Sequence, residues 1–301
     1  MLEAVPNASE GRRAEVVSAI GSAFAQDAVL LDTHADADHN RSVFTLAAEE
    51  GELVESLLAG IAAAVESIDL REHVGVHPRV GAVDVVPVVP FASESMERAK
   101  SVARLVAARV GEELRLPVFL YGQVGDERRR PAYFRRGGLD ELRRRVDAGE
   151  LVPDEGPGQV DPRSGAVLVG ARHALVAYNL DLTTEDARIA QAVAASVRES
   201  SGGMRGVQAI GLRLPGSGRT QVSMNVIDVD AAPLHEVVER VRREASARGV
   251  SVSGGELVGL VPERVVAAAA SAGAELPGVD ASQVLETVLR SRLAEWPTRS
   301  S

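Results

Sequence analysis

The chain has 301 residues, of which 45% are hydrophobic and 25% charged, so it can bury one large core or two smaller ones. The formal net charge of −10 argues against general nucleic-acid binding, which needs a basic surface. The absence of cysteine excludes disulfides, a thiolate nucleophile and a cysteine-ligated zinc site. No apolar run approaches the roughly 20 residues of a membrane span, and no signal-peptide pattern opens the chain, so we expect a cytoplasmic protein without a membrane partner.

The first half of the chain predicts elements in the order β-α-β-β-α-β, judged by hydrophobic periodicity. Ser9 is the candidate N-cap of the first helix. The six ranges are Leu2–Pro6, 12–26, Val29–Thr33, Ser42–Ala47, Glu52–Ser67 and Gly81–Val89. A helix, a strand and a short arginine-rich helix are expected to follow, at Ser95–Leu114, Pro117–Gly122 and Leu139–Ala148.

The same order repeats after a loop rich in glycine and proline, Val152–Gly165. The repeated elements are Ala166–Leu182, Thr184–Glu199, Val207–Leu214, Gln221–Val229, Leu234–Arg248 and Leu257–Val261. Two tail helices, 262–272 and 280–294, are expected to be docked by Trp296. This order is typical of the ferredoxin-like (βαββαβ) unit, in which helices cover one face of an antiparallel sheet. We therefore expect an α+β fold of two ferredoxin-like subdomains, 1–165 and 166–301, with a cleft between them.

A His-Pro-Arg sequence precedes the strand expected at Gly81–Val89. Pro78 and Gly81 indicate a rigid turn that presents His77 beside the fixed cation of Arg79. This pair suits proton transfer on a small anionic substrate, because an imidazole titrates near neutral pH. A lone histidine near the end of a strand is also commonly a hydrogen-bonded structural residue, so composition alone leaves both interpretations open.

The loop His34–Ser42 crowds ionisable side chains between two expected strands. Asp36 and Asp38 could bind a divalent cation, but their spacing matches neither a zinc pattern nor a calcium loop. Aspartate and asparagine could instead stabilise a turn through backbone hydrogen bonds. The third interpretation, a loop that positions a substrate, is the one we favour, and we expect no metal.

Nine segments spread over nearly the whole chain carry a family resemblance. They are 5–13, 36–45, 77–84, 165–172, 177–179, 197–200, 221–225, 233–235 and 256–262, and they read VPNASEGRR, DADHNRSVFT, HPRVGAVD, GAVLVGAR, AYN, VRES, QVSMN, PLH and ELVGLVP. In this order they resemble glutamate formimidoyltransferases, the formiminotransferase half of formiminotransferase-cyclodeaminase. We expect no cyclodeaminase domain.

The resemblance implies transfer of a formimino group from N-formimino-L-glutamate to N5 of tetrahydrofolate, with release of glutamate, in histidine breakdown and one-carbon metabolism. It implies that tetrahydrofolate is the acceptor substrate, held between the two subdomains, and that a homodimer forms. The histidine of the His-Pro-Arg motif, His77, is implied to be the catalytic base.

The residue types agree with this chemistry on independent grounds, because N5 must lose a proton and the departing nitrogen must gain one. Asp36 or Asp38 could orient His77 or stabilise the amidinium, and Arg41 and Arg79 could hold carboxylates. The other residues assigned to the substrates are His39 and Asn40 in the loop, and Gly165, Ala166, Gly170, Arg172 and Asn179 for the folate.

Two further interpretations concern small and basic residues. The glycines at 165 and 170 could let backbone approach a flat ligand or could simply allow tight strand packing. A basic patch could bind a polyglutamyl folate tail, although a solvated helix face is the favoured interpretation. Its members are Arg128–Arg130, Arg135, Arg136 and Arg143–Arg145.

Two other functions stay open. One is a folate-binding or regulatory module without catalysis, since the same fold serves many roles. The other is a transferase that uses a different one-carbon donor, such as a formyl group.

Overall fold

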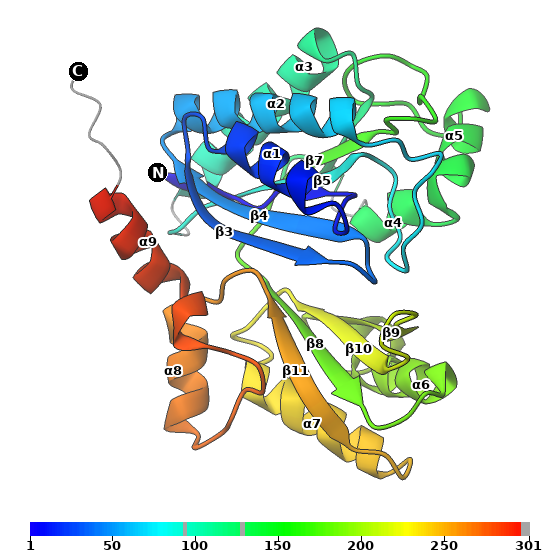
Figure 1. Ribbon diagram of the computed structural model, residues 1–301, viewed down its shortest axis with the longest axis vertical. Helices are drawn as coiled ribbons and strands as arrows, with labels where there is room; N and C mark the ends of the chain where they lie inside the picture. Colours follow the sequence, from blue (N-terminus) through cyan, green and yellow to red (C-terminus); the bar gives the residue numbers. More distant parts are fainter. Residues whose placement is uncertain (93–94, 127–129, 296–301) are drawn as a thin grey trace. The chain divides into compact units, whose positions relative to one another are not determined.

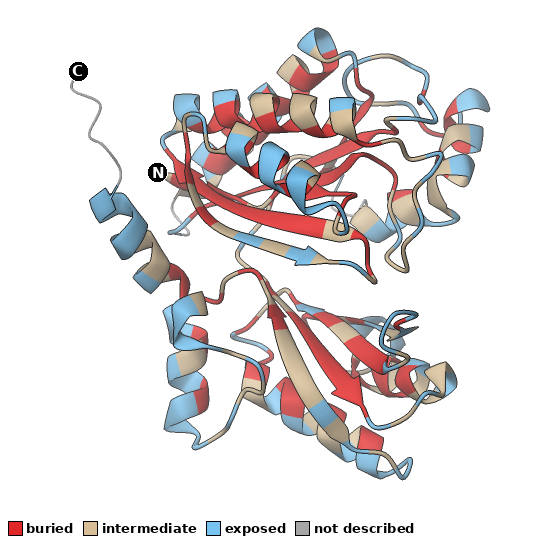
Figure 2. Ribbon diagram, in the orientation of Figure 1, coloured by how far each residue is buried: buried red, intermediate tan, exposed pale blue. Residues whose placement is uncertain are grey.

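The computed structural model describes residues 1–92, 95–126 and 130–295. The chain divides into two compact units, Met1–His173 and Ala174–Ser301 (Figure 1). In each unit the buried residues gather on the strands and on the helix faces turned toward them (Figure 2). The docking role expected of Trp296 falls outside the described residues. Within the described ranges, none of the helices combines the length and the apolarity that a membrane span requires.

The first unit begins with the expected βαββαβ order. Its elements are β1 (Leu2–Ala4), β2 (Asn7–Ala8), α1 (Ala14–Phe24), β3 (Val29–Asp36), β4 (Arg41–Ala48), α2 (Glu50–Ser67) and β5 (Val83–Val89). β1 and β2 together act as the first strand, because both pair with β4 on one side and β5 on the other. β3 pairs with the outer edge of β4. The resulting antiparallel arrangement confirms the ferredoxin-like prediction.

The first unit then extends its sheet beyond the ferredoxin-like core. The added elements are α3 (Met96–Glu113), β6 (Val118–Gly122), α4 (Pro131–Arg135), α5 (Gly138–Asp147) and β7 (Val167–Ala171). β7 pairs in parallel with β5 and with β6. One face of this region packs on the cluster that contains α1, α2 and α3, and the other face contributes to a second cluster with α4 and α5. Burial on both faces explains why β5 and β7 read as continuous apolar runs.

The second unit repeats the order with a four-stranded sheet. Its elements are β8 (Val176–Leu182), α6 (Ala187–Val197), β9 (Val207–Arg213), β10 (Thr220–Val226), α7 (Leu234–Ser246) and β11 (Val252–Val258), followed by α8 (Glu263–Ser271) and α9 (Leu285–Glu295). The strand order is β11-β8-β10-β9, with antiparallel pairs throughout. This is again the ferredoxin-like arrangement, with α6 and α7 on one face of the sheet (Figure 1).

Some local predictions differ from the structure. The strand expected over Ala166–Leu182 is two strands, β7 and β8, which belong to different sheets. The first unit therefore extends to His173, beyond the boundary expected at 165/166. The last strand begins at Val252 rather than Leu257, because glycines inside β11 weaken its sequence signal.

Ser9 was expected to cap α1, but it does not. Its hydroxyl donates to the carbonyl of Gly81 at 2.7 Å. The carboxylate of Glu10 accepts the N–H groups of Arg12 and Arg13 instead, at 2.8 and 3.0 Å. Ser9 therefore ties the beginning of the chain to the segment that precedes β5.

Candidate active site

The turn between β3 and β4 is shaped by its own polar side chains. The carboxylate of Asp36 accepts the N–H of His39 at 2.6 Å. Asn40 has a left-handed backbone with φ of 46°. Its side chain accepts the N–H of Gly11 at 3.0 Å and donates to the carbonyl of Val74 at 3.0 Å. Asp36 and Asn40 thus make the backbone hydrogen bonds of the tight-turn interpretation, and Asn40 also joins this turn to two other loops.

Arg79 fastens the same turn to the loop that carries His77. Its guanidinium donates to the carbonyl of His77 at 3.1 and 2.7 Å. It also donates to the carbonyls of His39 at 3.1 Å and Asn40 at 3.4 Å, and contacts Nε2 of His73 at 2.6 Å. Burial, above all, lowers the pKa of Arg79 to about 10. Arg79 therefore joins the backbone at His77 to the backbone of the turn at His39 and Asn40.

His77 contacts the first residue of β4. Nη1 of Arg41 lies 2.6 Å from Nε2 of His77. Because a guanidinium only donates, Nε2 must accept this hydrogen bond, which assigns the proton of the neutral ring to Nδ1. The rings of His39 and His77 lie near each other, with centroids 6.1 Å apart. Burial, followed by the cations of Arg41 and Arg135, holds the pKa of His77 well below its usual value. The imidazole is therefore neutral at neutral pH.

A third arginine and a buried carboxylate complete this charged group. Asp84, on β5, is 2% exposed and accepts the N–H of Val80 at 2.8 Å. Nη2 of Arg135, on α4, lies 2.5 Å from Oδ2 of Asp84. Burial and then the charge of Arg135 lower the pKa of Arg41 to about 9, although Asp84 acts in the opposite direction. The guanidiniums of Arg41, Arg79 and Arg135 thus lie near a single carboxylate, which leaves an excess of positive charge.

The glycines assigned to folate binding pack closely against protein. Gly165 has φ of 73°, and a Cβ there would lie 2.1 Å from the carbonyl oxygen of Val80. The N–H of Ala166 donates to that same oxygen at 2.9 Å. At Gly170 a Cβ would lie 2.6 Å from the ring of Tyr121. These contacts are those of the strand-packing interpretation, and they set the segment beside the His77 loop.

Arg172 follows β7 and lies next to Tyr121. The two side chains interact by a hydrogen bond, and Arg172 also donates to the carbonyl of His173 at 2.9 Å. Burial raises the pKa of Tyr121, because the phenolate would be poorly solvated. Arg172 thus adds a further half-buried cation to the first unit.

The second unit carries a row of polar side chains on its strands. Asn179 and Asp181 alternate along β8 with Tyr178 and Leu180, which belong to the apolar core. The amide of Asn179 donates to the carboxylate of Glu256 at 3.2 Å. Asp181 accepts from Gln221 at 3.2 Å and pairs with Arg219. The strand register therefore places amides and carboxylates together on the face opposite α6 and α7.

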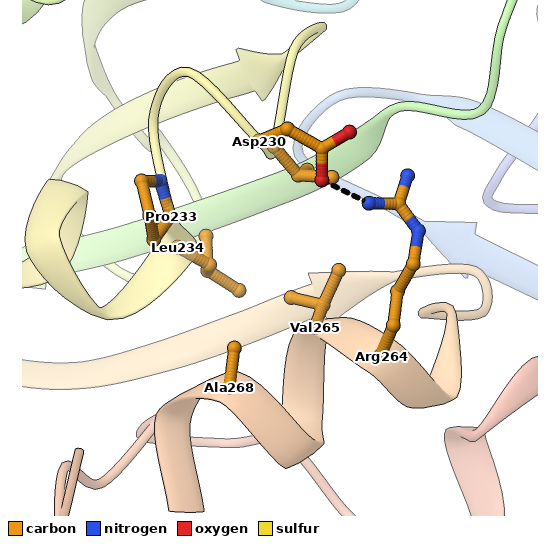
Figure 3. Close-up of a pocket in the computed structure, with 7 residues that line it drawn as sticks. Asp230, Pro233, Leu234, Arg264, Val265 and Ala268 are labelled. Atoms are coloured by element: carbon orange, nitrogen blue, oxygen red, sulfur yellow. Dashed lines mark hydrogen bonds and ion pairs between the residues drawn. The ribbon is translucent and has the colours of Figure 1, made fainter. Parts of the chain in front are cut away.

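A separate cavity lies between α7 and α8 in the second unit (Figure 3). It has a volume of about 270 Å³ and a mostly apolar lining, with an ion pair between Arg264 and Asp230 at its edge. None of the site residues predicted from the sequence lines it. Among the described residues, no group of three or more His, Asp or Glu side chains is placed to hold a metal ion.

The residues that sequence reasoning missed are Asp84, Arg135 and His73. Asp84 had a visible signal, a charged residue inside the apolar run of β5. Arg135 was counted only in the basic patch, of which Arg128 and Arg129 lie outside the described residues. Nothing in the spacing of the sequence indicates the contact between His73 and Arg79.

The comparisons with known proteins agree with this arrangement of two units. The model of the formiminotransferase domain, N-terminal subdomain, matches residues 1–172, and the model of the formiminotransferase domain matches residues 177–275. Glutamate formimidoyltransferase of Thermoplasma acidophilum is 38% identical over 292 residues, covering 95% of this chain and 96% of that protein. Its counterpart in Streptococcus pyogenes is 35% identical over 270 residues, covering 88% and 90%.

A longer relative also matches. Formimidoyltransferase-cyclodeaminase of Gallus gallus is 39% identical over 280 residues, which are 90% of this chain and 52% of that protein. The chain therefore spans about half the length of this relative. The family resemblance inferred from the sequence is confirmed, and the chain belongs to the formiminotransferase family.

Proposed function

We propose that this protein is a glutamate formimidoyltransferase in which His77 transfers the proton between the two reacting nitrogens. Two relatives that match most of the chain bear that enzyme's name. The observation that carries the residue assignment is the position of His77, which is neutral and held by Arg41 at 2.6 Å. A neutral imidazole is able to accept a proton, and the cations beside it suit an anionic donor.

The reaction exchanges one carbon–nitrogen bond for another. N5 of tetrahydrofolate attacks the amidine carbon of N-formimino-L-glutamate, and the new N–C bond forms. His77 takes the proton of N5 and returns it to the glutamate nitrogen as the old C–N bond breaks. Positioned proton transfer of this kind typically contributes about 10²–10⁴-fold in rate.

The remaining site residues divide between binding and positioning. Arg41 would bind a carboxylate of the donor, with Arg135 as a second cation, because a guanidinium and a carboxylate form strong paired hydrogen bonds. Asp36 or Asp38 would stabilise the amidinium. Arg79 would position His77 rather than touch the donor, since its guanidinium already binds three backbone carbonyls.

The polar strand face of the second unit would supply hydrogen bonds to the pterin. Asn179 and its partner Glu256 are the residues that we assign there, because a pterin offers both donors and acceptors along one edge. The close packing at Gly165, Ala166 and Gly170 would shape the surface that the folate contacts. The homodimer stays a prediction.

The proposal is tested by offering different donors to the purified protein with tetrahydrofolate. N-Formimino-L-glutamate and N-formyl-L-glutamate are supplied separately, and release of glutamate is followed. We expect glutamate release from the formimino compound at an enzymatic rate. Faster release from the formyl compound would make the protein a transferase for another donor. Binding of tetrahydrofolate without glutamate release from either compound would favour the non-catalytic folate module.

A further inference from the structure

The lone pair that His77 needs as a base is engaged by Arg41. A neutral imidazole has one nitrogen that accepts a proton and one that carries a proton. Nη1 of Arg41 donates to Nε2 at 2.6 Å, so the accepting nitrogen is already used. In this state His77 cannot take a proton from an incoming amine without first losing its contact with Arg41.

Arg41 contacts His77 but forms no ion pair with a carboxylate among the described residues. Among the described residues, no carboxylate lies within ion-pair distance of Arg41, and its buried Nε atom has no hydrogen-bond partner. The nearby carboxylate of Asp84 is bound to Arg135 and to the N–H of Val80. Nε of Arg135 is likewise buried and without a partner in the described part of the chain. Arg41 and Arg135 therefore share one nearby carboxylate, and Arg79 adds a further positive charge.

An arriving carboxylate would change the partner of Arg41. A carboxylate carries a full negative charge and can accept two parallel N–H bonds from a guanidinium, whereas a neutral imidazole offers one uncharged acceptor. The neutral imidazole of His77 is the weaker acceptor of the two. Movement of Arg41 toward a carboxylate would release Nε2, and neutralisation of the nearby charge would raise the basicity of His77.

We infer that Arg41 masks the base in the free enzyme and that a carboxylate of the donor unmasks it by drawing the guanidinium away. This inference rests on the proposed function, and it assigns to Arg41 a part in controlling the reaction as well as in binding. Transfer would depend on a carboxylate in the site, even when that carboxylate belongs to a separate molecule.

The dependence of transfer on a carboxylate can be tested by supplying the amidine and the carboxylates on two separate molecules. Formamidine carries the reacting amidine without a carboxylate. N5 attacks its carbon, the C–N bond to the departing nitrogen breaks, and ammonia leaves with the proton that His77 took from N5. Glutarate supplies the missing carboxylates and has no group to transfer. Formation of formimino-tetrahydrofolate and release of ammonia are both measured.

In the wild type, we expect saturating glutarate to increase transfer from formamidine by about tenfold or more, because release of Nε2 lets His77 take part in proton transfer, which typically contributes about 10²–10⁴-fold. In Arg41→Met the base is never masked, so transfer from formamidine should be independent of glutarate and at least as fast as in the activated wild type. The same variant should lose about tenfold or more in kcat/KM for N-formimino-L-glutamate, because a carboxylate ligand is gone.

The matched control is Arg109→Met, which removes an arginine of α3 that pairs with Glu55 and Glu113 on the surface. This variant should keep the response of the wild type to glutarate. No response in the wild type, or an undiminished response in Arg41→Met, would overturn the inference. Turnover of N-formimino-L-glutamate by the wild type is measured first, so a failure of the proposed function is seen separately.

A second measurement needs no turnover. NMR of ¹⁵N-histidine-labelled protein, with the resonance identified through His77→Gln, reports the protonation of His77. The charged or titratable groups around this ring are Arg41, Arg79, Arg135, His39 and Asp84. Glutarate should raise the pKa of His77 in the wild type, and Arg41→Met should raise it without glutarate. If neither change shifts the pKa, Arg41 does not mask this base.

Discussion

The two units share one order of strands and helices but place their polar side chains differently. In the first unit His77 and Arg79 lie on a loop. The imidazole of His77 accepts from Arg41, and Arg79 donates to the backbone carbonyls of His77 and His39. In the second unit Asn179 and Asp181 lie on β8, held by the register of the sheet. Loops bring together groups that no periodic element could, whereas a strand presents them at regular spacing.

This difference predicts that the two units have different roles in the reaction. The first unit concentrates cations and a neutral base, so its residues should control the rate of chemistry. The second unit offers amides and carboxylates on a rigid surface, so its residues should control binding of the acceptor. The following substitutions test this division, from the largest expected effect to the smallest.

Loss of Asp84 should damage the first unit most. Asp84→Ala leaves Arg135 as a half-buried cation without its carboxylate, and breaking a buried pair in this way costs about 3–5 kcal/mol. Urea denaturation measures the loss, with hydrogen exchange of β5 amides reporting on the first unit. Glu55→Ala, which breaks an exposed pair with Arg109, is the control and should cost less than about 1 kcal/mol. A loss of less than about 1 kcal/mol in Asp84→Ala, as in the control, would contradict this role of Asp84.

Loss of Asn179 should affect binding rather than rate. Asn179→Ala removes the amide that donates to Glu256, and we expect KM for tetrahydrofolate to rise about tenfold with kcat changed by less than about twofold. Steady-state kinetics at saturating donor give both values. Gln191→Ala, an exposed position on α6, is the control. A large fall in kcat with KM unchanged would contradict the division between the units.

Acid should weaken the first unit through His73. Burial and then the charge of Arg79 lower the pKa of His73 from 6.5 to about 4. Between these values the unfolded chain binds a proton that the folded chain does not, so stability should fall as pH decreases from about 6.5 to about 4. His73→Gln should remove about 1 kcal/mol of this fall, since solvent screens part of the effect. Urea midpoints across this range, unchanged by the substitution, would exclude His73 as the cause.

The fold could be predicted well because buried positions recur in the sequence with the period of the helix or strand that carries them. The alternation of Tyr178 and Leu180 with polar neighbours on β8, and the apolar run of β5, both identify strands without knowledge of their partners. The break inside Ala166–Leu182 was missed because β7 and β8 both give a strand signal and only a few residues separate them. Periodicity cannot tell which sheet a strand joins.

The site could be predicted only in part. His77 and the turn at Asp36–Arg41 stood out through dense ionisable residues and a family motif. Asp84 and Arg135 are 51 residues apart, and their pairing depends on the packing of α4. The bonds from Arg79 to backbone carbonyls carry no sequence signal, because every residue has a carbonyl. Long-range contacts of this kind need the folded chain.

The central claim, that His77 transfers the proton, is tested most directly by kcat for formimino transfer in His77→Ala. We predict a fall of about 10²–10⁴-fold, with an unchanged urea midpoint and KM for tetrahydrofolate within about threefold of the wild type. A variant that keeps the fold and transfers the formimino group at close to the wild-type rate would contradict the account.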